Sequence, residues 1–384
     1  MSNDRFVDVT RRGYFQRLAG SFGGIAIGFL LVVAAVPLLW WNEGRAVKAQ
    51  RALDEATKLV VDIDAGKADA ANNGRLVHVA GDAVSHSPVR DGDLNLVFND
   101  VVLVVRSVAM YQWLEQKDTR SVDELGGGQR TETTYSYRQD WSDQWKNSEV
   151  FKHPTGHANP QMPLQSQSWA ATGTTLGAFT LEREALLQLQ AGSPRKPDKI
   201  PDGWKDDGDG LYRGTDPSAP QLGDLRVRYT MIASPAEVSV MARQMGSGFE
   251  TYEMPNGYPI FFVNDGRRSA EEMIKHRRDA EMMITWLLRG LGLGLMWIGF
   301  CLVMGPLKAL ANVLPFLAGV AGFAIAVVAL ALTLPIGLGT IGLAWLFYRP
   351  ITGLLLLASS VAGSYLLVRY RHHIAPASAS ARPV

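Results

Sequence analysis

The sequence contains a single cysteine, Cys301, and no acidic residue after Glu281. One cysteine excludes an intramolecular disulfide, so an exported domain must be held together by its packed core. The sequence also lacks G-x-S-x-G, Walker and Rossmann glycine patterns, which are common signatures of hydrolases and nucleotide-binding enzymes. Its 38 basic and 37 acidic residues give a net charge of +1, and no basic block indicates a nucleic-acid partner.

Charge is concentrated in the middle of the chain. Of the 75 charged side chains, 63 lie between Asn42 and Glu281, and this block has a net charge of −7. The flanking stretches are nearly uncharged and apolar, so a plain soluble globule and a disordered chain are both excluded. The apolar segments offer only Arg289 as an ionisable group, so ion-coupled transport through one subunit is not expected; an oligomeric channel is a minor alternative.

Two apolar segments flank the charged block. Residues 18–42 form an uncharged run of 25 residues, which exceeds the roughly 20 needed to cross a bilayer and the 7–15 typical of a signal peptide. We therefore predict an uncleaved first transmembrane helix there. Residues 282–307 predict the second, in which Arg289 is expected to extend toward water.

The uncharged run 309–348 is too long for one straight span. Pro315 and Gly319 predict an interfacial piece over residues 312–319, followed by a long third span with a kink near Pro335. Residues 350–368 predict the fourth span. Basic flanks then place both termini in the cytoplasm. The predicted parts are 1–17 (cytoplasmic), 18–42 (transmembrane helix 1), 43–281 (extracytoplasmic domain), 282–307 (transmembrane helix 2), 308–319 (cytoplasmic or interfacial connection), 320–348 (transmembrane helix 3), 350–368 (transmembrane helix 4) and 369–384 (cytoplasmic tail).

The domain between the first two spans is predicted to be mainly β, of α+β class. Residues 45–61 favour an amphipathic helix, and residues 181–189 a short helix. Ser269 and Glu272 fit a capping box that starts a helix running into the second span. Gly126-Gly127-Gly128 predicts a long hairpin over residues 101–145. The predicted strands are 76–80, 101–113, 133–141, 225–231, 238–242 and 258–263.

Neither of two candidate metal sites fits its motif well. His153 and His157 are four residues apart, but Pro154 between them opposes the helix that would align two ligands. Residues 205–210 resemble a calcium loop, yet Lys205 occupies its first ligand position. We therefore predict structural loops, with no catalytic residue, metal or cofactor.

Aromatic and glycine residues supply candidate contacts. Tryptophan and tyrosine dominate interface hot spots, although a β-domain core would use the same residues. Small residues four apart let membrane helices approach closely, either within the chain or between copies. The aromatic candidates are Tyr111, Trp113, Tyr135, Tyr137, Trp141 and Trp145, and the glycine candidates are Gly24, Gly28, Gly290 and Gly294.

Short strings along nearly the whole chain resemble the transmembrane protein 43 family, also called LUMA. These strings are Asn42-Glu43-Gly44-Arg45, Gly74-Arg75-Leu76-Val77-His78-Val79, Met110-Tyr111-Gln112-Trp113, Tyr135-Ser136-Tyr137 with Trp141, Gly156-His157-Ala158-Asn159-Pro160, Gly223-Asp224-Leu225-Arg226-Val227 and Leu346-Phe347-Tyr348-Arg349-Pro350.

The resemblance implies four spans with a lumenal domain, self-association and the organisation of membrane protein complexes. Eukaryotic members are placed in the endoplasmic reticulum and inner nuclear membrane, with lamins and emerin as partners. The Ala- and Gly-rich spans and the tail from Ala375 to Val384 are typical of a bacterial member, so those partners are not carried over. The family has no established catalytic residues.

These observations predict a multi-pass α-helical membrane protein, with four transmembrane helices, that acts as a non-enzymatic scaffold in a bacterial inner membrane with its domain periplasmic. Its expected partners are further copies of itself, other membrane proteins and membrane lipids. The alternative is a lipid or hydrophobic-ligand binding protein, with an apolar pocket formed by the domain and residues 312–319 at the outer leaflet. A membrane-anchored enzyme, with a cleft of convergent His, Asp or Ser side chains, is a less favoured alternative.

Overall fold

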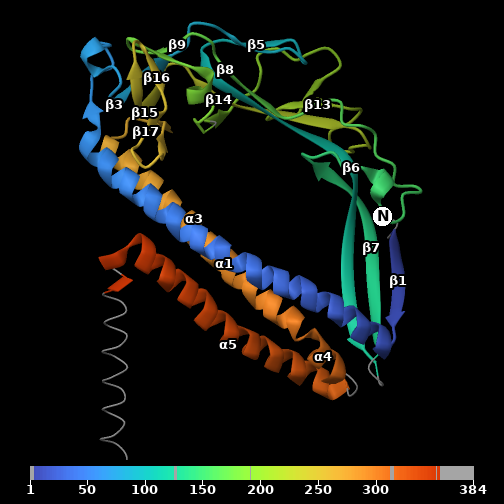
Figure 1. The fold of residues 1–384 in the computed structure, drawn as a ribbon. Helices are drawn as coiled ribbons and strands as arrows, with labels where there is room; N and C mark the ends of the chain where they lie inside the picture. Colours follow the sequence, from blue (N-terminus) through green and yellow to red (C-terminus); the bar gives the residue numbers. More distant parts are fainter. Residues whose placement is uncertain (1–3, 125–127, 191, 312–314, 352, 355–384) are drawn as a thin grey trace, which may run out of the picture. The chain divides into compact units, whose positions relative to one another are not determined.

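The computed structural model describes residues 4–124, 128–190, 192–311, 315–351 and 353–354. The chain divides into two compact units. The first contains the segment ending at Arg11 together with residues 51–122 and 129–279, and it carries most of the strands. The second contains residues 12–50, 123–128 and those from Ala280 onward, and it is mainly helical (Figure 1).

The first long helix, α1 (Tyr14–Leu59), runs for 46 residues without interruption. It joins the predicted first span and the predicted amphipathic helix into one element. Pro37 lies inside it and does not end it.

The second long helix, α3 (Ala270–Val303), begins at the predicted capping box. The Ser269 amide donates to Glu272 Oε2 at 2.9 Å, and the Glu272 amide donates to Ser269 Oγ at 3.2 Å. This reciprocal pair satisfies two amides that lack helical partners, so the predicted start is confirmed. α3 continues into the predicted second span but ends at Val303 rather than at residue 307, and the short α4 (Gly305–Ala311) follows.

The third long helix, α5 (Pro315–Tyr348), passes through Pro335 and Gly337. Residues 315–319, expected in a separate interfacial piece, are instead the first turns of this helix, because a proline at a helix start loses no hydrogen bond. Residues 312–314 and most of the predicted fourth span lie outside the described residues. Three described helices are long and apolar enough to cross a membrane: α1, α3 and residues 319–348 of α5.

The larger sheet has eight strands in the order β1-β7-β6-β14-β13-β12, with β8 also paired to β6 and β11 to β14. β14 pairs antiparallel with β6, and Val227 lies opposite Val108. The strands are β1 (Arg5–Arg12), β6 (Val101–Asp123), β7 (Gln129–Ser142), β8 (Gln167–Ala170), β11 (Ser193–Pro194), β12 (Lys205–Asp206), β13 (Leu211–Arg213) and β14 (Leu225–Ala233).

The predicted hairpin over residues 101–145 corresponds to β6 and β7, which are neighbours in this sheet. Both strands extend well beyond the sequence-based limits; β6 alone has 23 residues. Their distal parts carry charged side chains such as Asp118, Arg120 and Glu132.

Strand β1 lies within the segment 1–17 that was expected to precede the first span. It lies at the edge of the larger sheet beside β7, and the Tyr137 amide donates to the Asp4 carbonyl at 3.0 Å. Phe6 also stacks on His153, with ring centroids 4.2 Å apart. The segment that ends at Arg11 is therefore part of the β-rich unit, whereas the sequence-based division of the chain separated residues 1–17 from the domain. The arginines of this segment are typical of a basic flank before a membrane span, so the sequence did not predict a strand here.

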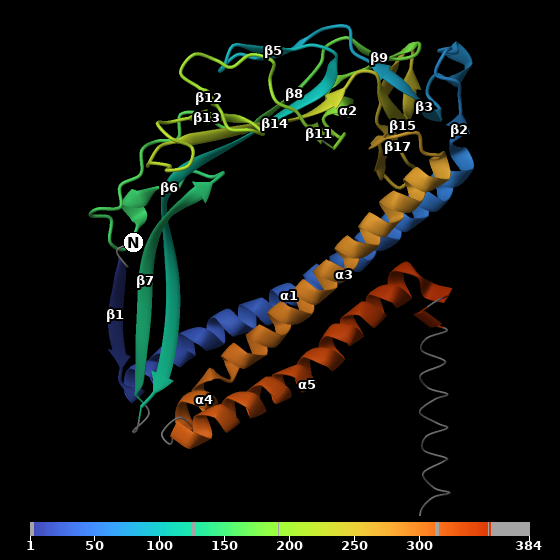
Figure 2. The same ribbon diagram turned by 180° about the vertical axis from the view of Figure 1, so that it is seen from behind.

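The smaller sheet has seven strands in the order β10-β9-β3-β15-β16, with β19 also paired to β15 and β2 to β3. Figure 2 shows β2, β3 and β15 together in this sheet. The strands are β2 (Val61–Asp62), β3 (Leu76–Val84), β9 (Thr174–Leu176), β10 (Phe179–Leu181), β15 (Ala236–Met245), β16 (Gly248–Glu250) and β19 (Phe262–Asp265).

Two strand pairs and several short helices complete the described fold. The pairs are β4 (Val89–Asp91) with β5 (Leu96–Phe98), and β17 (Tyr252–Glu253) with β18 (Pro259–Ile260). The predicted helix over residues 181–189 is reduced to α2 (Arg183–Leu186), and 3-10 turns occur at Ala70–Asn72 and Ser148–Val150.

The β-rich unit has two main apolar cores, and the first, that of the smaller sheet, also includes Val102 and Leu103 of β6. In the smaller sheet Val79, Val240 and Phe179 are buried, and Leu186 of α2 packs with them. In the larger sheet the core contains Val104, Val227 and Tyr229, among others. Burial of apolar side chains thus stabilises the β-rich unit. A single cysteine cannot form an intramolecular disulfide, so a packed core of this kind was expected.

Candidate functional site

The motif Asn42-Glu43-Gly44-Arg45 in α1 lies at the centre of a buried polar cluster. The Glu43 carboxylate is 2% exposed and accepts two hydrogen bonds from Arg289 of α3, at 2.7 and 2.8 Å. The indole N–H of Trp345 in α5 donates to Glu43 Oε2 at 2.7 Å. One carboxylate therefore joins three helices through charge-assisted hydrogen bonds, the class of hydrogen bond that is strongest in proteins.

Arg289 does not extend toward water as expected. Its side chain is 15% exposed, and its guanidinium carbon lies 4.7 Å from the ring centroid of Trp286 and 5.7 Å from that of Trp345. The carboxylate of Glu43 offsets the cost of burying this charge, and the two indole faces add cation–π attraction. The pairing with Glu43 fixes Arg289 inside the helix assembly.

A second ion pair lies within the same cluster. Arg45 pairs with Glu281 through Nη1, and its Nη2 donates to Thr285 Oγ1 at 3.0 Å. The side-chain amide of Asn42 donates to the Thr285 carbonyl at 3.1 Å. We call these residues the polar helix cluster: Asn42, Glu43, Arg45, Glu281, Thr285, Arg289 and Trp345.

The spacing along α3 explains why the cluster forms. Glu281, Thr285 and Arg289 are each four residues apart, so they lie on one face of the helix. This face carries one negative and one positive charge, and the α1 motif supplies the complementary pair. The four charges cancel, which reduces the cost of their burial.

Gly44 completes the motif by allowing close packing. A Cβ atom at this position would lie 2.8 Å from Cζ of the Tyr348 ring. Trp40 also contacts this region, with its ring centroid 6.0 Å from that of Tyr348. Aromatic side chains of α1, α3 and α5 therefore surround the polar helix cluster: Trp40, Trp286, Trp345 and Tyr348.

The four candidate glycines separate into two groups. A Cβ atom at Gly28 would lie 2.5 Å from the carbonyl oxygen of Gly299, and one at Gly24 would contact the Leu302 carbonyl at 3.6 Å. This pair therefore serves packing between α1 and α3. A Cβ at Gly290 or Gly294 would meet no described atom within 4 Å.

The six candidate aromatic residues do not form a single exposed patch. Tyr137 is buried; its hydroxyl donates to Glu115 Oε2 at 2.6 Å and accepts from the His153 amide at 3.0 Å. Burial and the bond to Glu115 raise the pKa of Tyr137 to about 12. Tyr111, Trp113, Tyr135 and Trp141 are half-buried.

Trp145 is the most exposed of the six. It is 43% exposed, and its indole N–H donates to the Pro160 carbonyl at 2.9 Å. With Met162 and Gln165 it borders an open hollow of about 570 Å³. Trp145 therefore remains a candidate for partner contact. Tyr137 is part of the β-domain core, which was the alternative interpretation of the aromatic candidates.

The two candidate metal sites are occupied by contacts within the chain. His157 Nδ1 lies 2.7 Å from the His153 carbonyl, and the His157 ring stacks on Tyr137 with centroids 3.9 Å apart. In the acidic loop, Asp206 pairs with Lys196, Asp207 with Arg226 at 2.9 Å, and Asp209 with Arg228 at 2.8 Å. Among the described residues no group of three or more His, Cys, Asp or Glu side chains could hold a metal ion.

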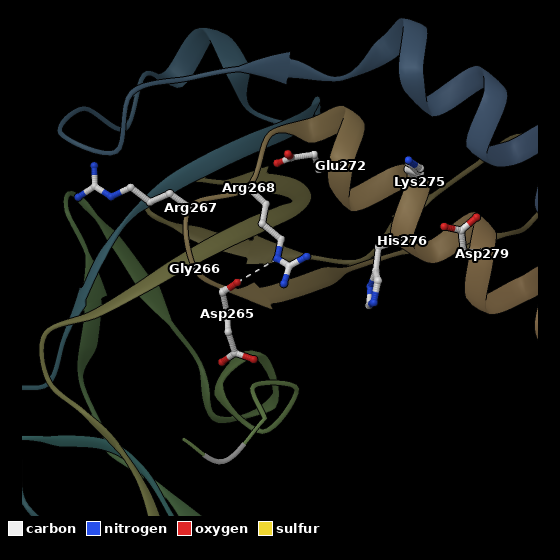
Figure 3. Close-up of a pocket in the computed structure, with 8 residues that line it drawn as sticks. All are labelled: Asp265, Gly266, Arg267, Arg268, Glu272, Lys275, His276 and Asp279. Carbon is white, nitrogen blue, oxygen red and sulfur yellow. Dashed lines mark hydrogen bonds between the residues drawn. The ribbon is translucent and has the colours of Figure 1, made fainter. Parts of the chain in front are cut away.

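An open hollow of about 520 Å³ lies beside the start of α3 (Figure 3). Arg267 pairs with Asp82 at 2.8 Å and with Glu237 at 3.2 Å, and Arg268 Nε donates to the Asp265 carbonyl at 3.1 Å. The side chains that line this hollow include both acidic and basic residues, and they point in different directions (Figure 3). They do not converge on one position, as a catalytic or ligand site requires.

Another buried ion pair, which sequence reasoning did not find, lies inside the larger sheet. Arg106 binds both oxygens of Asp91 at 2.6 and 2.7 Å, and the Tyr229 hydroxyl donates to Asp91 at 2.6 Å. Burial and then the Asp91 carboxylate raise the pKa of Tyr229. Arg106 also donates to Asp93 and to the Gln165 carbonyl, so these buried polar groups have partners within the chain and their role is structural.

Comparisons with known proteins agree with the strings in the sequence. The model of the family described as Transmembrane protein 43 matches residues 110–350. The chain is 30% identical to Transmembrane protein 43 of Rattus norvegicus and of Homo sapiens, in each case over 358 residues, 90% of this chain and 89% of the relative. It is 29% identical over 353 residues to the Transmembrane protein 43 homolog of Drosophila melanogaster, covering 87% of this chain and 91% of the relative.

No solved structure matches the chain. The family match covers more than half of the sequence, and the described helices include three of membrane-spanning length and composition. The chain is therefore an integral membrane protein that belongs to the transmembrane protein 43 family.

Proposed function

We propose that the chain is a non-enzymatic membrane scaffold that self-associates through its helices and organises other membrane proteins. The observation that carries the proposal is the polar helix cluster. The Glu43–Arg289 and Arg45–Glu281 pairs use these charges to hold α1, α3 and α5 together within one chain. Because each of these charged side chains is paired with another in the same chain, the cluster favours a rigid platform over an ion path or a reaction centre.

An apolar face of α3 supports the self-association part of the proposal. Met283, Leu287, Gly290 and Leu291 are exposed, and both Gly290 and Gly294 have open space above Cα among the described residues. They recur at helical spacing on one side of α3. A second copy could approach closely at the two glycines, where no side chain separates the helices.

The mass of the full chain in a mild detergent tests this proposal. Gly290→Leu is expected to lower the oligomer mass, because leucine fills the space that a second helix needs. Gly342→Leu is the matched control, since Gly342 is an exposed glycine of α5 that also has open space. A monomeric wild type, or an equal loss in both variants, would remove self-association through this face.

The proposed location is a bacterial inner membrane, with the acidic domain on the periplasmic side. Lys308, in the short α4 between two long apolar helices, supports a cytoplasmic position for that connection. A single cysteine at position 308, in a Cys301→Ser background, should react with an impermeant thiol reagent only from the cytoplasmic side. Labelling from the periplasmic side would reverse the proposed orientation.

A further inference from the structure

His78 is a residue of the smaller sheet that contacts two chain segments, one directly after the end of α1 and one directly before the start of α3. It is 6% exposed in β3, and both of its ring nitrogens have contacts. Nδ1 lies 2.6 Å from Asp62 Oδ1, and Nε2 lies 2.9 Å from the Arg268 carbonyl oxygen. Asp62 is in β2, which follows α1, and Arg268 directly precedes the Ser269 cap of α3.

Both partners of His78 are hydrogen-bond acceptors. A neutral imidazole has one N–H and one lone pair, so it can donate to only one of them, and its lone pair would face the other. Two donations require the imidazolium form. The Asp62 side chain is 77% exposed, so water solvates its carboxylate.

The contacts around His78 hold two chain segments in place. The Ile63 amide donates to the His78 carbonyl at 3.0 Å, which continues the parallel pairing of β2 with β3. The Arg268 amide donates to Ser239 Oγ at 2.8 Å, so His78 and Ser239 hold that residue on both sides. Loss of either imidazole contact would leave one segment held by its remaining backbone hydrogen bonds.

The neighbouring groups define the electrostatics of this position. Asp62, from β2, is the charged side chain in contact with the ring, and Met241 of β15 lies opposite His78 in the sheet. Arg268 presents its carbonyl, whereas its guanidinium donates to the Asp265 carbonyl. The ring is therefore in contact with one carboxylate and one carbonyl oxygen.

We propose that His78 is a proton-dependent clasp that fastens the segment after α1 and the segment before α3 to the same strand. In the protonated form both contacts form. When the ring loses its proton, one of the two contacts is lost, because a neutral imidazole has a single N–H. The stabilisation is thus present at acidic pH and lost as the pH rises. This inference is independent of the scaffold proposal.

Hydrogen exchange of the full chain in detergent micelles, between about pH 5.5 and 8, tests the clasp. After correction for the intrinsic exchange rate, peptides that contain Ile63 and Arg268 should exchange about tenfold faster at the higher pH, because a charge-assisted bond is lost. His78→Gln should remove this pH response, since glutamine does not titrate. Asp62→Asn should reduce it, and Asp198→Asn, at an exposed loop residue, is the control for net charge.

Nitrogen-15 NMR of histidine-labelled protein gives a second measurement. At about pH 5.5 the His78 signal, assigned by its loss in His78→Gln, should show N–H at both ring nitrogens, and exposed His86 serves as the reference. A neutral ring at that pH, or the same exchange response in wild type and His78→Gln, would overturn the clasp. If His78→Gln does not fold, the comparison of Asp62→Asn with Asp198→Asn decides the question.

Discussion

Glu43 of α1 and Arg289 of α3 form a two-point ion pair, with N–O distances of 2.7 and 2.8 Å, although they are 246 positions apart in the sequence. The indole of Trp345 adds a third helix to the same carboxylate. Each charge is supported by its partner, so the pair acts as a unit. The packing of α1, α3 and α5 against one another therefore depends on side chains from three segments that are distant in the sequence.

Removing one member of this pair should cost more than removing both. Glu43→Gln leaves the Arg289 guanidinium buried without a counter-charge, and we expect the free energy of unfolding to fall by about 3–5 kcal/mol. The double variant Glu43→Leu/Arg289→Leu should recover part of this loss. Denaturant unfolding in mild detergent measures both, with Glu55→Gln at an exposed position of α1 as the control. Additive single effects would contradict the pairing.

Gly44→Ala tests the close contact with Tyr348. The added methyl would lie 2.8 Å from the ring, so helix packing must shift, at an expected cost of about 1–3 kcal/mol. Tyr348→Leu should rescue Gly44→Ala by removing the ring that the methyl meets. Thermal unfolding in detergent is the measurement. If Gly44→Ala destabilised the wild type and the Tyr348→Leu variant equally, the ring would not be the obstacle.

Local patterns in the sequence predicted the elements that local physics determines. Residues 18–42 identified the apolar part of α1, and Ser269 with Glu272 identified the start of α3, because run length and capping depend on neighbouring residues alone. The hairpin of β6 and β7 was found for the same reason. The limits were less accurate where a partner decides them, as at Val303 and in the distal part of β6.

Contacts between distant segments could not be predicted in the same way. Arg289 appeared to be a lone charge near the edge of an apolar run, and its partner lies in another helix. β1 appeared to be a basic flank, because its pairing with β7 is visible only once the sheet has formed. One feature of the sequence could have indicated the polar helix cluster. Glu43 and Arg45, an acid and a base, directly follow the apolar run 18–42.

Alkaline pH should weaken the β-rich unit through Tyr137. Because its pKa rises from 10.0 to about 12, the folded state retains the hydroxyl proton where the unfolded state releases it. The stability contributed by this proton is present below pH 10 and is lost as the pH rises from 10 to 12. Denaturant unfolding at pH 9 and at about pH 11 should show a larger loss in wild type than in Tyr137→Phe. A loss of equal size in both proteins would assign the pH effect to other groups.

The pairing of β1 with the β-rich unit predicts a specific cross-link. Asp8 and Lys152 form an ion pair with an N–O distance of 3.4 Å, so cysteines at these positions, in a Cys301→Ser background, should be joined within one chain by a short bifunctional thiol reagent. Each single-cysteine variant is the control for cross-links between chains. An impermeant thiol reagent should reach both positions from the same side of the membrane, because the two side chains are in contact. Labelling from opposite sides, with no cross-link within the chain, would contradict the pairing of β1 with the β-rich unit.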